Sequence, residues 1–156
     1  MNIDIEFYDT VNNTGVAPGT IVEHDGDLYR FVHLQTSSGA ISVGSVLYWL
    51  PAIGEGEVTD DVANSKLNFA YAVSSLALAT TLGGYFWAYY RKNGITMTTN
   101  GDDDIAQGDS IIGATAGIVN SVTAGTACTY KCIGFAQADD DNAANTVLVN
   151  VDLTGS

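Results

Sequence analysis

Hydrophobic and polar residues alternate along several short stretches of the chain, the pattern of β-strands with one buried face. The cleanest alternation covers residues 147–153, where the side chains predicted to face inward are Val147, Val149, Val151 and Leu153. The same period of two marks residues 28–34 and residues 45–49, and Pro51 ends the second of these stretches. These stretches predict short strands rather than long helices.

Turn signals separate the predicted strands. The sequence His24-Asp25-Gly26-Asp27 lies between two extended runs. Asp-Gly at that place predicts a tight hairpin, because glycine tolerates the positive φ that such turns require. Residues 67–82 are the one ambiguous stretch, since a strand-like start is followed by Ala and Leu residues that also fit a short helical turn.

Residues 85–90 read Tyr-Phe-Trp-Ala-Tyr-Tyr and are apolar on both faces. We expect a strand that is covered on both sides, either by the protein's own core and a loop or by a partner subunit. The aromatic side chains that we place in the core or in an oligomer interface are Trp49, Tyr85, Trp87 and Tyr89.

A shift of 64 residues aligns segment 40–73 with segment 104–137. Seven identities fall in register without a gap: Ile41 with Ile105, Gly44 with Gly108, Ala52 with Ala116, Val58 with Val122, Thr59 with Thr123, Ala63 with Ala127, and Ala72 with Ala136. This pattern indicates two pseudo-repeats. The fold expected is all-β, a compact barrel or sandwich over residues 18–156, with residues 1–17 forming an extended N-terminal arm.

Charge changes the range of partners that we expect. The 156 residues are 46% hydrophobic, enough for a core, and 18 acidic residues face five basic ones, for a formal net charge of -13. Because a surface with this much negative charge repels phosphate backbones and anionic lipids, we expect neither nucleic acid nor a membrane as partner. There is no apolar run of about 18 residues, and the acidic start does not resemble a signal peptide.

Candidate catalytic and metal-binding residues are few. The two histidines, His24 and His33, are expected in a turn and on a strand, without a nucleophile motif nearby. Acidic clusters at 60–61, 102–104 and 139–141 fit solvated turns better than calcium loops, because their spacing lacks the calcium-loop pattern. Cys128 and Cys132 are expected as small buried thiols, with an intersubunit disulfide as the alternative. We therefore predict no cofactor, no metal and no enzyme activity.

The order of several segments carries a family resemblance. Ala17-Pro18-Gly19-Thr20-Ile21-Val22 precedes the hairpin, and the strand at 41–49 ends on Tyr48-Trp49. The aromatic strand, a second strand that starts at Gly108-Asp109, Ile133-Gly134-Phe135-Ala136 and a Val-rich last strand at 146–151 follow. This order resembles tailed-phage capsid decoration (cement) proteins over most of the chain from about residue 17.

The resemblance implies a β-barrel or sandwich body, and trimers or copies clustered near threefold axes of an icosahedral head. It implies a virion protein that is soluble in the host cytoplasm before assembly and then binds the capsid exterior. Its partners would be further copies of itself, in a homotrimer, and the major capsid protein, whose capsomers it holds together. For the arm we predict capsid contact through Ile3, Ile5, Phe7 and Tyr8.

Two other functions fit parts of the pattern. A glycan-binding module or phage fibre domain would use the aromatic strand as a sugar-stacking platform. A small hydrolase would need His24 or His33 to line a pocket together with a nucleophile.

Overall fold

The computed structural model describes residues 2–36, 40–61, 70–78, 82–101, 104–114, 117–122 and 132–154. Within these ranges the chain forms eleven β-strands and no helix. The all-β prediction is therefore confirmed.

Five strands close into a barrel. Around the ring they are β3 (Asp27–Thr36), β5 (Glu57–Thr59), β4 (Val46–Trp49), β6 (Ala70–Val73) and β7 (Leu82–Thr98). The ring closes because β3 pairs with β7 as well as with β5. The pairing of β3 with β5 is parallel and the other four are antiparallel, which makes the barrel mixed.

The predicted hairpin joins β2 (Ile21–His24) to β3. Its two central residues, Asp25 and Gly26, have φ angles of 52° and 84°. Positive φ at both central positions is the conformation that suits the twist of paired strands, and it explains why Asp-Gly stands there.

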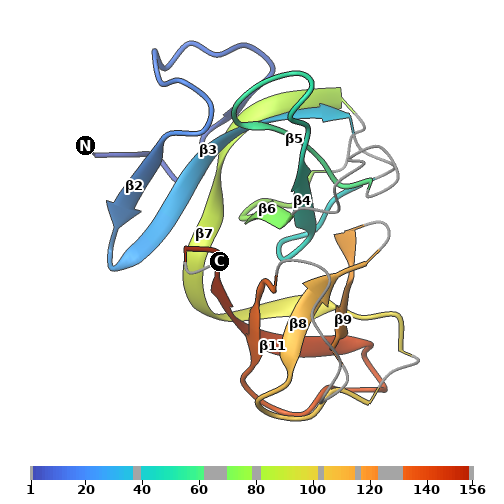
Figure 1. Ribbon diagram of the computed structural model, residues 1–156. Helices are drawn as coiled ribbons and strands as arrows, with labels where there is room; N and C mark the ends of the chain where they lie inside the picture. The colour runs from blue at the N-terminus through green and yellow to red at the C-terminus, as the bar shows by residue number, and fades with distance from the viewer. Residues whose placement is uncertain are drawn as a thin grey trace.

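A second sheet extends from the far half of β7. It contains β11 (Thr146–Asp152), β10 (Gly134–Ala136), β8 (Ser110–Gly113) and β9 (Val119–Ser121), in that order away from β7. Figure 1 shows β7 curving out of the barrel into this sheet. At 17 residues, β7 is much longer than the predicted strand at 85–90, because its second half pairs with β11.

The core has a barrel interior and a larger layer between the barrel and the second sheet. Inside the barrel lie residues such as Val32, Leu34 and Phe86, each with no exposed surface. The layer between the sheets includes the inward residues predicted for the last strand, which are at most 2% exposed: Val147, Val149, Val151 and Leu153. The prediction for that strand is confirmed.

The two segments with related sequences have the same strand order. The first cassette, as we call it, runs β5-β4-β6-β7, and the second cassette runs β9-β8-β10-β11. Each begins with a turn at a glycine of φ 91°, Gly44 or Gly108. Equivalent backbone bonds close the two turns, from Ser45 N to Ser42 O and from Asp109 N to Ala106 O, both 3.0 Å.

The ambiguous stretch at 67–82 begins as a strand, since β6 covers Ala70–Val73. No helical turn follows in residues 74–78, where Leu78 instead bridges to Ile41. Residues 67–69 and 79–81, as well as Cys128, lie outside the described residues, and Cys132 is partly buried.

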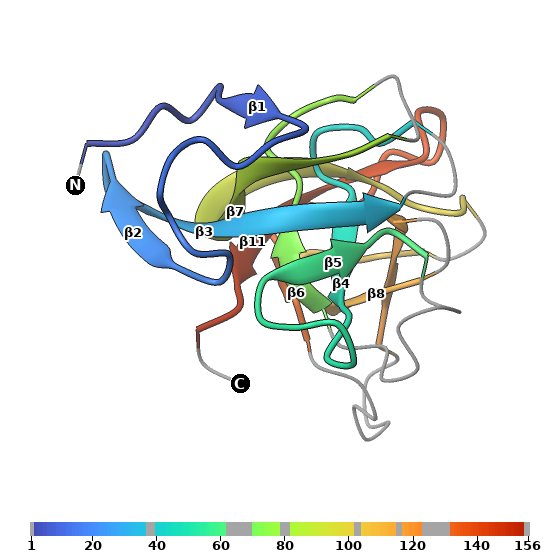
Figure 2. The ribbon, with the colours of Figure 1, turned by 90° about the horizontal axis from the view of Figure 1, so that it is seen from above.

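The N-terminal segment, residues 2–16, runs along the barrel. Most of it has no regular structure, and its only strand, β1 (Tyr8–Asp9), pairs with β7. Figure 2 shows β1 above β7 with the rest of the segment looping beside β2.

Candidate functional site

The outer face of β3 and β7 carries a ladder of aromatic rings. The pairing register sets Tyr29 opposite Tyr89, Phe31 opposite Trp87 and His33 opposite Tyr85. Ring centroids in these pairs lie 5.4, 4.9 and 4.0 Å apart. Every second residue of a strand points to the same face, so the alternation in the sequence places all six rings together.

The N-terminal segment covers the middle of this ladder. Ile3 is 9% exposed and packs with Phe31 and Trp87, and the Phe7 ring lies 6.3 Å from that of Phe31. Tyr8 is paired in register with Phe86 through β1. A hollow of about 430 Å³ remains between the segment and Trp87. The segment therefore packs on the barrel but leaves part of the space next to Trp87 unfilled.

The four residues predicted to contact a capsid thus lie against the protein's own barrel. Ile3, Ile5 and Phe7 pack on the aromatic ladder, and Tyr8 packs against the barrel core. In this arrangement the side chains are held by their own chain, and a capsid contact through them stays a prediction.

The four aromatic residues predicted for a core or an interface fall in two places. Tyr85, Trp87 and Tyr89 share the outer face of β7, and Trp87 is 3% exposed, whereas its two neighbours are partly buried. Trp49 is on β4 and stacks on Tyr71 with ring centroids 5.8 Å apart. Since β4 is not a neighbour of β7, these residues do not form one patch.

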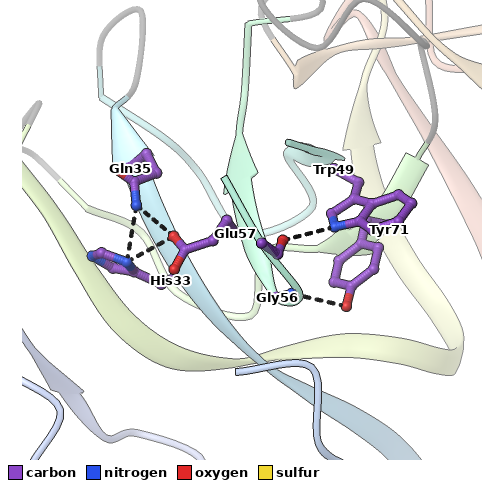
Figure 3. A network of polar contacts seen from close by, with 7 residues as sticks. His33, Gln35, Trp49, Gly56, Glu57 and Tyr71 are labelled. Carbon is purple, nitrogen blue, oxygen red and sulfur yellow. Dashed lines mark hydrogen bonds and ion pairs between the residues drawn. The ribbon is translucent and has the colours of Figure 1, made fainter. Parts of the chain in front are cut away.

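A polar cluster lies at one end of the ladder (Figure 3). The His33 Nδ1 atom is 2.8 Å from a Glu57 carboxylate oxygen, and Gln35 contacts both groups. The His33 ring lies flat on Tyr85, with 4° between the planes. The side chains of His33 and Glu57 are 20% and 17% exposed. The His33 ring is therefore partly accessible to solvent, while Glu57, Gln35 and Tyr85 fix its position.

Sequence reasoning missed this cluster because it depends on the parallel pairing of β3 with β5. That pairing sets His33 beside Glu57, residues far apart in the sequence. A period of two identifies the face of a strand but not its neighbour. Among the described residues, His33 contacts Glu57, Gln35 and Tyr85, none of which is a Ser, Thr or Cys nucleophile. His24 contacts Asp25 and Tyr29.

A second feature not predicted from the sequence is the position of Arg30. Its guanidinium lies 3.9 Å from the Tyr71 ring centre and 4.1 Å from that of Tyr90, and it donates to the Tyr71 carbonyl at 3.1 Å. Such a cation between two rings is held by their negative faces. Burial, and then a hydrogen bond to Glu55, raise the pKa of the Tyr71 hydroxyl well above its usual range. Figure 3 shows that hydroxyl accepting from Gly56 N, and Trp49 Nε1 donating to a nearby backbone carbonyl.

Carboxylates in the acidic turns of the second cassette accept hydrogen bonds from backbone N–H groups. Asp141 Oδ1 accepts from Ala143 N at 3.1 Å and from Ala144 N at 3.2 Å, and Asp139 Oδ1 accepts from Gln107 N at 2.9 Å. No group of three or more His, Cys, Asp or Glu side chains suited to a metal occurs among the described residues. The described part of the chain also contains no helix long and apolar enough to cross a membrane.

The basic groups that the structure describes are mostly engaged. Arg30 lies between its two rings, and Lys92 pairs with Asp27, which raises the pKa of Lys92. Arg91 is exposed. On the described part of the chain the solvent therefore meets many carboxylates and few cations, and a partner surface with basic groups would be complementary to it.

No protein-family model matches this chain. No curated protein matches it either.

Proposed function

We propose that this protein is a phage capsid decoration protein, which binds the outside of the head and stabilises contacts between capsomers of the major capsid protein. The observation that carries the proposal is the N-terminal segment, residues 2–16. It is apolar where it meets the barrel, and a two-residue strand holds it there. Fifteen residues released from the barrel span at most about 50 Å.

That reach suits a protein that joins neighbouring subunits. A body bound at one place and a segment bound at another place gain affinity together, even where each contact is modest. Release has a cost, because it exposes Phe31 and Trp87 to water. A partner must therefore either cover this ladder or bind the segment more strongly than the barrel does.

The charge of the chain also favours an assembly role. A formal net charge of -13 keeps the free protein soluble in the host cytoplasm and directs it toward a basic shell surface. It weighs against phosphate backbones and anionic membranes as partners. We propose that the protein acts as a homotrimer on the exterior of the virion, without catalysis.

A glycan-binding role has less support. Trp87 lies in the aromatic strand that would form the sugar platform, but it is 3% exposed beneath the N-terminal segment. A sugar-stacking ring needs an open face, so the aromatic strand does not offer that platform while the segment is seated.

The test is binding to expanded heads of the encoding phage that lack this protein. We expect saturable co-sedimentation and a higher temperature of head disruption, and light scattering should give the mass of a trimer. Heads that neither bind the protein nor gain stability would contradict the proposed function.

A paired variant tests the segment in the same assay. Ile3→Ala with Phe7→Ala removes apolar contacts of the segment, whereas Asn12→Ser with Asn13→Ser changes exposed or half-buried polar residues of the same segment. The first pair should bind heads at least about tenfold more weakly, and the second within about twofold. Equal binding by both pairs would remove the segment from the contact.

A further inference from the structure

Equivalent faces of the two cassettes are buried to very different extents. On the outer face of the first cassette, Val46 pairs with Val73, and neither has exposed surface. On the second cassette, Ser110 pairs with Phe135. Val46 and Ser110 each stand two residues after the turn glycine, so in the strand pairing Phe135 occupies the position of Val73. This pairing differs by two residues from the ungapped sequence alignment, which sets Ala72 with Ala136. Phe135 is 57% exposed.

The difference has a simple structural cause. The second cassette lies on the outer face of the first, so that Val46 and Val73 share one core cluster with residues such as Ile111 and Val149. The second cassette lies in the lower part of Figure 1, and its outer face is the one opposite to the side chains that share this core cluster. Phe135 is thus the centre of a face whose counterpart within the same chain is fully covered.

The surroundings of Phe135 suit a protein contact. Ser110 and Asn150 are its direct neighbours across the sheet, and Leu148 and Ile112 lie diagonally on the same face, both half-buried. Burying the exposed part of this phenylalanine side chain removes apolar surface from water and so favours association. An aromatic centre with an uncharged polar border is the usual composition of an interface core.

Exposed carboxylates stand at one end of this face. Asp104, Asp139 and Asp141 lie in the turns next to β8, β10 and β11, and bonds from Gln107 to Asp139 and from Asn142 to Asp104 tie these turns together. A partner that approaches Phe135 therefore also meets a group of negative charges. Basic side chains around an apolar pocket would complement both features.

We infer that the outer face of the second cassette, centred on Phe135, is the surface by which the body of the protein docks on a protein partner. The partner's complementary surface is an apolar pocket bordered by Lys or Arg. This inference rests on the proposed function, in which that partner is the shell protein of the head. The N-terminal segment then supplies a second, separate contact.

The experiment compares two substitutions of equally exposed residues. Phe135→Asp places a charge at the centre of the face, and Ile53→Asp does the same on the loop between β4 and β5, where Ile53 is also 57% exposed. Binding to heads is measured by saturation co-sedimentation at low and high salt. We expect Phe135→Asp to weaken binding at least about thirtyfold and Ile53→Asp to stay within about twofold of the wild type. Wild-type binding should fall as salt rises.

The outcomes separate the two proposals. Wild-type protein that does not bind heads contradicts the proposed function itself. Wild-type protein that binds, with Phe135→Asp binding equally well or both variants failing alike, overturns the docking surface and leaves the function standing. A lower oligomer mass for Phe135→Asp than for the wild type in light scattering also overturns the docking surface, because the face would then join copies of this chain. Phe135→Ser, which adds no charge, should show the same direction of effect in a folded protein.

Discussion

The two cassettes share their strand order and their opening glycine turn, yet they end in different environments. The first cassette is closed into a barrel by β3 on one side and covered by the second cassette on the other. The second cassette is covered on one side and leaves Phe135 exposed on the other. Strand order therefore sets the scaffold, whereas what covers each face decides whether its side chains are buried or exposed.

The largest expected difference is between Val73→Asp and Phe135→Asp. Val73 has no exposed surface, so an aspartate there buries an unpaired carboxylate at a cost of at least about 3–5 kcal/mol. Since a domain is stable by only about 5–15 kcal/mol, this variant should be largely unfolded or melt far below the wild type. Phe135→Asp should change the free energy of unfolding by no more than about 0.5 kcal/mol. Circular dichroism melts measure both, and similar losses in the two variants would contradict the difference in burial between the two faces.

The two turn glycines give the next largest difference. Both have φ of 91°, where an alanine is strained by about 1–2 kcal/mol. A methyl group at Gly44 would also overlap the Thr96 carbonyl oxygen, whereas a methyl group at Gly108 meets no atom within 4 Å. We expect Gly44→Ala to cost about 3 kcal/mol or more and Gly108→Ala about 1 kcal/mol. Urea unfolding measures the two values, and equal losses would show that strain alone governs both turns.

The smallest effect concerns alkaline pH and the first cassette. Burial raises the pKa of Tyr48 and of Tyr71 above the ordinary value of 10.0. The unfolded chain therefore loses these protons first, so the stability they contribute is complete below about pH 10 and is lost as pH rises above it. We expect the urea concentration at the midpoint of unfolding to decrease as the pH is raised from 9 to 11.

Tyr48→Phe is the control for that experiment. The Tyr48 hydroxyl donates to Ala114 O at 2.6 Å and so joins the first cassette to the second. Its removal should cost about 1 kcal/mol at pH 8. The variant should also lose less stability than the wild type between pH 9 and pH 11, and an unchanged pH dependence would show that Tyr48 is not responsible.

Much of the fold follows from local sequence patterns. Alternation predicted the last strand and the strand at residues 28–34, which is part of β3, and Asp25-Gly26 predicted the hairpin, because each depends on a few adjacent residues. The parallel pairing of β3 with β5 could not be predicted in this way. The contact between His33 and Glu57 depends on that pairing, so it could not be predicted either. The sequence also did not reveal that the N-terminal segment lies on Trp87, because an apolar segment alone does not identify the surface that it covers.

The length of β7 has a consequence for how the molecule unfolds. One continuous strand of 17 residues supplies hydrogen bonds to the barrel with its first half and to the second sheet with its second half. Neither half of the protein can open fully without removing a shared strand from the other. The two cassettes should therefore melt in one cooperative transition, and the amides at the centre of β7 should be among the last to exchange with deuterium.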